Sequence, residues 1–207
     1  MTRVSVVALL LSASYALAQQ YKAEPAGAPP PAEVAAPMTA LLQKDGVKIT
    51  NKGAPYCELW FRTAKPSGGT SEEGASVTGV PMGAFLGVIR FDGRGADRRG
   101  QNIKSGVYIL RYGLIPINGD HQGAAPQRDF MVMSLSGEDK DPKATPAFEA
   151  LTTESKKVSG TPHPAVLSFW KADNDTPGLT QQGDDWVLQV KLGDTTIALI
   201  VVGVASS

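Results

Sequence analysis

The chain has 207 residues with 20 basic and 20 acidic side chains, so its formal net charge is zero. This balance offers no extended positive field for a phosphate backbone, which argues against a nucleic-acid partner. One cysteine excludes an intramolecular disulfide framework and a cysteine-rich metal centre, and the two histidines, His121 and His163, are too few for a three-histidine metal site.

Residues 1–18 have the pattern of a secretory signal peptide. Arg3 precedes the apolar run 4–11, and Ala16-Leu17-Ala18 is typical of a signal-peptidase site. The apolar run is interrupted by serines and is shorter than the roughly 20 residues that cross a bilayer, so we expect no membrane span. Cleavage after the alanine motif would leave Gln19 as the first residue of a periplasmic or secreted protein.

Residues 19–37 are dominated by alanine and proline. Such a composition buries little apolar surface and favours extended conformations, so we expect a disordered Pro/Ala-rich spacer. A proline-rich ligand for a recognition domain is the alternative, supported only by Pro29-Pro30-Pro31.

Residues 38–207 are long enough for a single domain with a full hydrophobic core. The clearest two-residue alternation runs over 186–192, which places Trp186, Leu188, Val190 and Leu192 on one face and Gln189 and Lys191 on the other. Gly193-Asp194 then predicts a hairpin to a second strand over 195–204. The other expected strands are, in chain order, 46–50, 56–62, 85–91, 107–115, 130–135 and 165–171.

Two short helices are expected, one over 38–44 and one that begins with Thr145 and Pro146 and ends near Gly160. They do not alternate with the strands, so a parallel α/β fold is disfavoured. We therefore expect an all-β fold, an antiparallel β-sandwich of about eight strands with one or two short helices in loops.

The densest polar segment between two strands is 111–130, which contains Asp120, His121, Arg128 and Asp129. Loops held by a rigid sheet often carry binding and catalytic groups. Asp120 could orient the imidazole of His121 or share a metal with it. The alternative, which we favour, is architectural: Asp120 and Asp129 accept hydrogen bonds from turn amides, and Arg128 pairs with a carboxylate.

The same segment carries a resemblance to a known family. The run RYGLIPINGDHQGAAPQRDF, with CELWFR and FLGVIRF before it, resembles a family of uncharacterised exported proteins of soil bacteria, acidobacteria in particular. The shared pattern is RYGL-x-P-x-x-G-D-H-x-G-x-x-P-x-R-D-F, and the resemblance spans residues 56–135. It implies export and brings no known activity.

The strand 56–62 is a second candidate site. Alternation places Glu58, Trp60 and Arg62 on one face with Tyr56, and aromatic rings flanked by charged groups can form a carbohydrate-binding platform. An ordinary amphipathic strand with a cross-strand ion pair has the same composition, and we favour it. Cys57 falls on the opposite, apolar face and is expected to be buried.

Residues 173–184 imitate part of a calcium loop, with Asp173, Asp175 and Asp184 at its first, third and twelfth positions. Pro177 occupies a ligand position, and strands instead of helices flank the segment. A solvated hairpin loop is therefore the favoured interpretation. No cofactor is expected, with Ca²⁺ or another divalent metal as the alternative.

Three classes of function remain open. The favoured one is a non-enzymatic exported module that binds a glycan, a protein or an envelope component. The second is a periplasmic hydrolase or isomerase, with or without a bound metal, in which Asp120, His121 and Asp129 act with Glu58 or Arg62. The third is a structural component of an envelope assembly.

Overall fold

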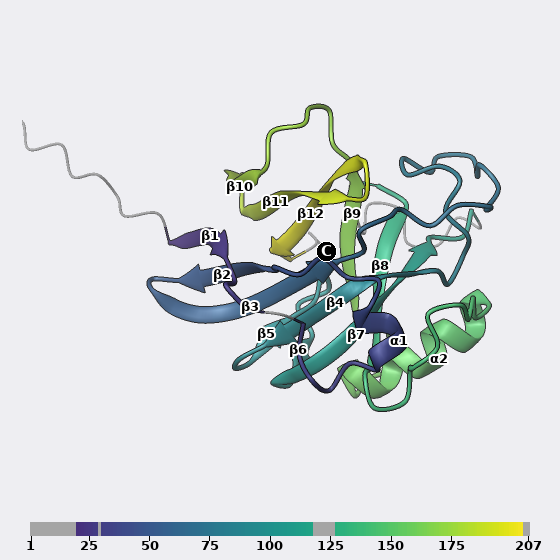
Figure 1. Cartoon of the computed structure of the whole chain (residues 1–207), viewed down its shortest axis with the longest axis horizontal. Coiled ribbons are helices and arrows are strands. Elements are labelled where there is room, and N and C mark those ends of the chain that lie inside the picture. Colours follow the sequence, from purple (N-terminus) through teal and green to yellow (C-terminus); the bar gives the residue numbers. More distant parts are fainter. Residues whose placement is uncertain (1–19, 29, 118–126, 205–207) are drawn as a thin grey trace, which may run out of the picture.

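The computed structural model describes residues 20–28, 30–117 and 127–204. The fold is all-β, with 9% helix and 42% strand, which confirms the predicted fold class. Ten strands form one antiparallel sheet in the order β1-β2-β3-β4-β7-β8-β9-β12-β11-β10, while β5 and β6 form a separate small ribbon (Figure 1). The main sheet is nearly barrel-shaped and is not a clear eight-stranded sandwich.

The sheet has two halves that meet at β9. The first half contains β1 (Tyr21–Pro25), β2 (Val47–Asn51), β3 (Ala54–Phe61), β4 (Phe85–Phe91), β7 (Gly106–Leu114) and β8 (Asp129–Leu135). The second contains β9 (Val166–Lys171), β12 (Thr195–Val202), β11 (Asp185–Leu192) and β10 (Gly178–Gln182). The remaining elements are β5 (Gly95–Ala96), β6 (Asn102–Ile103), α1 (Ala36–Thr39) and α2 (Phe148–Ser159).

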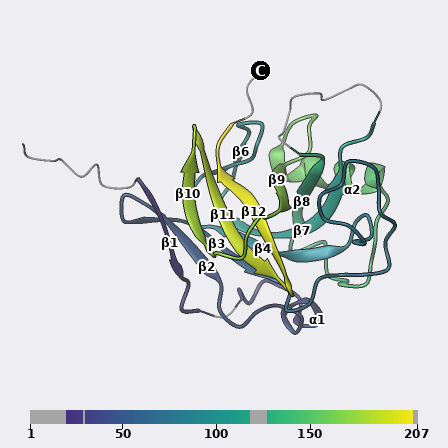
Figure 2. The same ribbon diagram turned by 90° about the horizontal axis from the view of Figure 1, so that it is seen from above.

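The pairing of β9 explains why the predicted sandwich was wrong. Its first residues, 166–168, pair with β8, whereas its last residues, 169–171, pair with β12. One strand therefore belongs to both halves and joins them into a single curved sheet. Figure 2 shows the consequence, because β10, β11 and β12 cross in front of β2, β3 and β4.

The main hydrophobic core lies between these two halves. It receives Cys57, Leu59 and Phe61 from β3 and the apolar face of β11, whose first and last members are Trp186 and Leu192. The alternation predicted over 186–192 is therefore confirmed, as is the burial of Cys57.

The prediction of a disordered spacer over 19–37 was wrong, because this segment contains β1. Tyr21 to Pro25 pair in register with β2, and the Tyr21 ring lies 5.3 Å from the Trp186 ring of β11. Val34 is also buried. The average composition of the segment gave no sign that Tyr21 and Val34 would be buried. The edge of β2 supplies the partners for the backbone hydrogen bonds of β1.

The second helix, α2, follows the predicted helix closely at its end and less closely at its start. It begins at Phe148, three residues after Thr145, and ends at Ser159, followed by Gly160, whose φ of 66° gives the left-handed cap typical of glycine. Leu151 packs on Val132 of β8 and Val166 of β9, so the helix covers the outer face of these strands (Figure 1). In the described part of the chain, no helix is long and apolar enough to cross a membrane.

Candidate functional site

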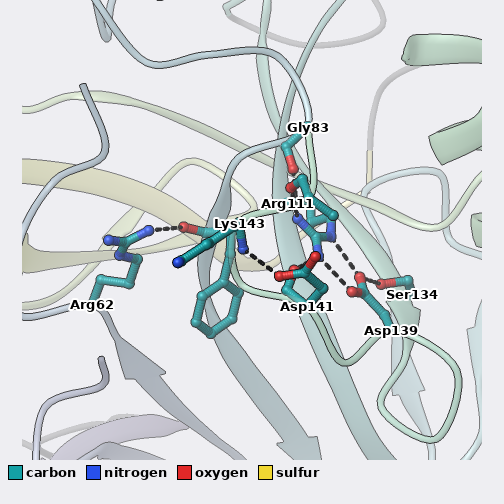
Figure 3. Close-up of polar contacts among 9 residues, drawn as sticks. Arg62, Gly83, Arg111, Ser134, Asp139, Asp141 and Lys143 are labelled. Atoms are coloured by element: carbon teal, nitrogen blue, oxygen red, sulfur yellow. Dashed lines mark hydrogen bonds and ion pairs between the residues drawn. The ribbon is translucent and has the colours of Figure 1, made fainter. Parts of the chain in front are cut away.

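A buried arginine on β7 organises the region next to α2 (Figure 3). Arg111 is 1% exposed, and its guanidinium donates to both carboxylate oxygens of Asp139, from Nε at 2.6 Å and from Nη2 at 2.5 Å. Ser134 Oγ donates a further hydrogen bond of 2.6 Å to the same carboxylate. This bidentate pairing is the strong, directional form of an arginine–carboxylate contact.

The remaining donors of Arg111 hold two separate loops. Nη1 donates to the carbonyl oxygens of Gly83 at 2.8 Å and Ala144 at 2.6 Å, and Nη2 donates to that of Asp141 at 2.8 Å. All five N–H groups of the guanidinium are thus used. The loop at Gly83 and the segment that leads into α2 are consequently fixed to the same strand.

Gly83 allows its loop to pack closely on the segment that leads into α2. Its φ of 75° lies in the left-handed region, and a Cβ at this position would collide with the backbone of Pro146. The two loops therefore pack directly on each other. Because Pro146 lies two residues before Phe148, the packing fixes where α2 begins.

Phe148 stands between two hollows that share Ile115 and Pro116 as further walls; we call them together the Phe148 site. The larger hollow has a volume of about 400 Å³ and the smaller one about 70 Å³. The larger is also lined by Thr70, Glu72, Val80, Met82, Leu114 and Arg128. The smaller is also lined by Arg98, Arg99, Phe130, Thr152, His163 and Val166.

Charged side chains lie at both hollows. Arg98 is paired with Asp185 at 2.5 Å, so its charge is compensated. Arg128 donates from Nε and Nη2 to the carbonyl oxygen of Ile115, at 2.9 and 2.6 Å. Its Nη1 is buried without a hydrogen-bond partner among the described residues. The site therefore combines apolar walls with a small number of polar groups, as ligand pockets commonly do.

Asp129 has the architectural role that the sequence favoured. Its fully buried carboxylate accepts hydrogen bonds from Ser76 N at 2.8 Å, Ser76 Oγ at 2.9 Å, Val77 N at 3.2 Å and Tyr112 Oη at 3.0 Å. Burial, and then the negative charge of Asp129, raise the pKa of the Tyr112 phenol. Arg128 departs from the prediction, because its partner among the described residues is a carbonyl oxygen and not a carboxylate. Asp120 and His121 lie outside the described residues.

The residues of the predicted carbohydrate platform are mostly covered. Trp60 is fully buried beneath Val34, Met38 and Leu42, and its Nε1 donates to the carbonyl oxygen of Ala28 at 3.1 Å. The cover comes from Val34 and Ala28 of the expected spacer and from Met38 and Leu42 of the helix expected over 38–44.

The charged residues of the same strand have structural partners. Glu58 is 5% exposed and pairs with Arg90 of β4 at 2.5 Å, which is the cross-strand ion pair of the favoured interpretation. Arg62 Nη1 donates to the carbonyl oxygen of Phe85 at 3.4 Å (Figure 3). Tyr56 turns to the inner face and packs on Phe91, because a β-bulge at this point of β3 breaks the alternation.

The aspartates of the calcium-like segment do not converge. Asp175 accepts hydrogen bonds from Lys191 Nζ, at 2.8 Å, and from Thr196 Oγ1. Strand β10 separates it from Asp184, and five extended residues span roughly 15 Å. Asp173 and Asp184 are exposed in the loops at either end of this strand. Within the described ranges, no three His, Cys, Asp or Glu side chains form a metal-binding group.

The sequence located one wall of the Phe148 site and missed the others. The polar segment 111–130 supplies this wall through Tyr112, Leu114, Ile115, Pro116, Arg128 and Phe130. Phe148 lies in the predicted helix that ends near Gly160, and neither this helix nor the loop containing Glu72 carried a signal for a site. Comparison with protein-family models, with curated proteins and with solved structures finds no match.

Proposed function

We propose that the chain is an exported binding protein that takes a small ligand with an apolar part in the Phe148 site. The observation that carries this proposal is the larger hollow, an open depression of about 400 Å³ whose lining is mainly apolar and also includes Arg128 and Glu72. Pockets for small ligands typically have volumes of roughly 300–1,000 Å³, apolar walls and a few oriented polar groups.

The rigidity of the walls also supports binding. The hydrogen bonds of Arg111 fix both the loop at Gly83, next to Met82, and the segment before Phe148. A site that is held in shape before the ligand arrives loses less conformational entropy on binding. The hydrogen bonds of Arg111 therefore hold two walls of the site in position.

Export to the periplasm or the medium is part of the proposal. Strand β1 begins at Tyr21, so cleavage after Ala18 would remove no residue of the sheet. N-terminal sequencing of the protein recovered from its native host should begin at Gln19. Recovery of the protein with Met1 intact would contradict the signal peptide.

Binding can be tested by a melting screen against glycans, peptides and amphiphiles, using the wild type and Phe148→Ala. A ligand that binds only the folded state raises the melting temperature. We expect at least one compound to do so in the wild type and not in Phe148→Ala. Trp170→Ala, which truncates a half-buried aromatic outside the site, is the matched control and should keep the response. An equal response in Phe148→Ala would place the ligand elsewhere.

A further inference from the structure

The charges around the Phe148 site define the ligand more closely, and the following inference rests on the proposed function. We infer that the ligand is an anionic amphiphile, a carboxylate attached to an apolar chain. Four basic side chains line the two hollows, Arg98, Arg99, Arg128 and His163, against the single acidic side chain of Glu72. In a chain with equal numbers of acidic and basic residues, this local excess favours an anion.

Arg99 is the basic group best placed to receive the anion. The carboxylate of Asp97 accepts hydrogen bonds from Arg99 N at 3.0 Å and from Gln101 N at 2.8 Å, which fixes the turn that carries Arg99. The Arg99 guanidinium itself is exposed and forms no hydrogen bond or ion pair with the described residues. A planar donor fork held at the rim of an apolar hollow suits a carboxylate.

His163 lies at the same hollow and is also available. Its backbone is fixed, because its carbonyl oxygen accepts a hydrogen bond of 2.6 Å from Ser159 Oγ. Its exposed imidazole forms no hydrogen bond with any side chain or backbone group in the described ranges. Together with Arg99 it offers a second N–H donor to the same anion.

The other charges do not oppose this assignment. Arg98 is compensated by Asp185, and the Glu72 carboxylate is exposed and accepts a hydrogen bond of 2.7 Å from Thr70 Oγ1. A cationic head group would lie beside two basic side chains, Arg99 and His163, that have no acidic partner among the described residues. A neutral sugar head group would gain nothing from their charge. The apolar chain of the ligand would lie against Phe148, which borders both hollows.

The test compares three amphiphiles that share a ten-carbon chain: decanoate, decyl maltoside and decyltrimethylammonium. Calorimetric titration of the mature chain, below the micelle concentration of each, measures the dissociation constants. We expect decanoate to bind about tenfold or more tightly than the other two, because hydrogen bonds to a charged group are stronger than those to a neutral one.

Variants locate the head group. Arg99→Gln/His163→Gln should weaken decanoate binding by about tenfold or more and leave the melting temperature of the free protein unchanged, since both side chains are exposed. Arg94→Gln, an exposed arginine beside β5 that does not line the hollow, should bind decanoate as the wild type does.

The outcomes separate the two levels of the proposal. Equal affinity for the three amphiphiles, or unchanged decanoate binding in Arg99→Gln/His163→Gln, would overturn the anionic ligand. The binding site itself would stand if Phe148→Ala still abolished binding. Decanoate binding that survived in Phe148→Ala would overturn both.

Discussion

Replacing Arg111 by methionine tests whether the buried arginine supports the Phe148 site. Methionine has a similar length and no charge, so it removes the guanidinium without opening a large cavity. The Asp139 carboxylate, which is 15% exposed, would keep only its hydrogen bond from Ser134. The carbonyl oxygens of Gly83, Ala144 and Asp141 would lose their donor.

The expected loss of stability is large. Removing one partner of a buried ion pair costs about 3–5 kcal/mol, because the other charge remains without compensation. For a domain of this size, each kcal/mol corresponds to a change of about 2–4 °C in melting temperature. The melting temperature of Arg111→Met should therefore fall by roughly 6–20 °C.

Urea unfolding followed by tryptophan fluorescence measures this loss. Arg94→Met, at an exposed arginine, is the control and should unfold as the wild type does. In the double variant Arg111→Met/Asp139→Leu no buried charge remains uncompensated, so it should be more stable than Arg111→Met. A loss below about 1 kcal/mol in Arg111→Met, or a double variant less stable than the single one, would refute the role assigned to this ion pair.

Four further predictions concern the fold. Burial raises the pKa of each described tyrosine, so these phenols should stay protonated in the folded protein above pH 10. The absorbance at 295 nm that reports their ionisation should therefore rise only as the chain unfolds. Because only the unfolded chain ionises there, the free energy of unfolding should fall as the pH rises above 10. These tyrosines are Tyr21, Tyr56, Tyr108 and Tyr112. The thiol of Cys57 is fully buried, and that burial raises its pKa, so it should react with a thiol reagent only in denaturant. Rapid reaction of the native protein would contradict the buried position of this thiol. Gly83→Ala should destabilise the domain by more than about 1 kcal/mol in thermal melting, since the alanine Cβ meets Pro146, and an unchanged melting temperature would show that the loops are not in contact. Tyr21→Ala should lower stability by about 1–3 kcal/mol and alter the Trp186 fluorescence, whereas a detached N-terminal segment would change neither.

Local patterns predicted the elements well where one interaction dominates. The alternation over 186–192 located β11 because one face of that strand lies in the core. The position of Asp129 between a glycine-rich turn and a strand indicated a group that bonds backbone amides, and it does. The pattern of β11 follows from its own residues, whereas the amides that Asp129 bonds belong to Ser76 and Val77, a loop that the sequence did not indicate.

Contacts between distant segments escaped prediction. Nothing near Trp60 indicates that Val34 and Met38 cover it, because Val34 lies in a segment with the composition of a linker and Met38 lies in a short separate helix. The division of β9 between two neighbours depends on how the sheet curves, which no local pattern records. Most of the Phe148 site was missed for the same reason, since its walls come from seven separate stretches of the chain.

The two edge strands of the sheet, β1 and β10, lie side by side, with the Tyr21 and Trp186 rings in contact near the junction. An open edge invites a strand from another molecule, which is a common first step of aggregation. Here each edge is turned toward the other, so an approaching chain would have to displace one of them. For a protein proposed to work outside the cytoplasm, the contact between the two edges would reduce the self-association of folded chains.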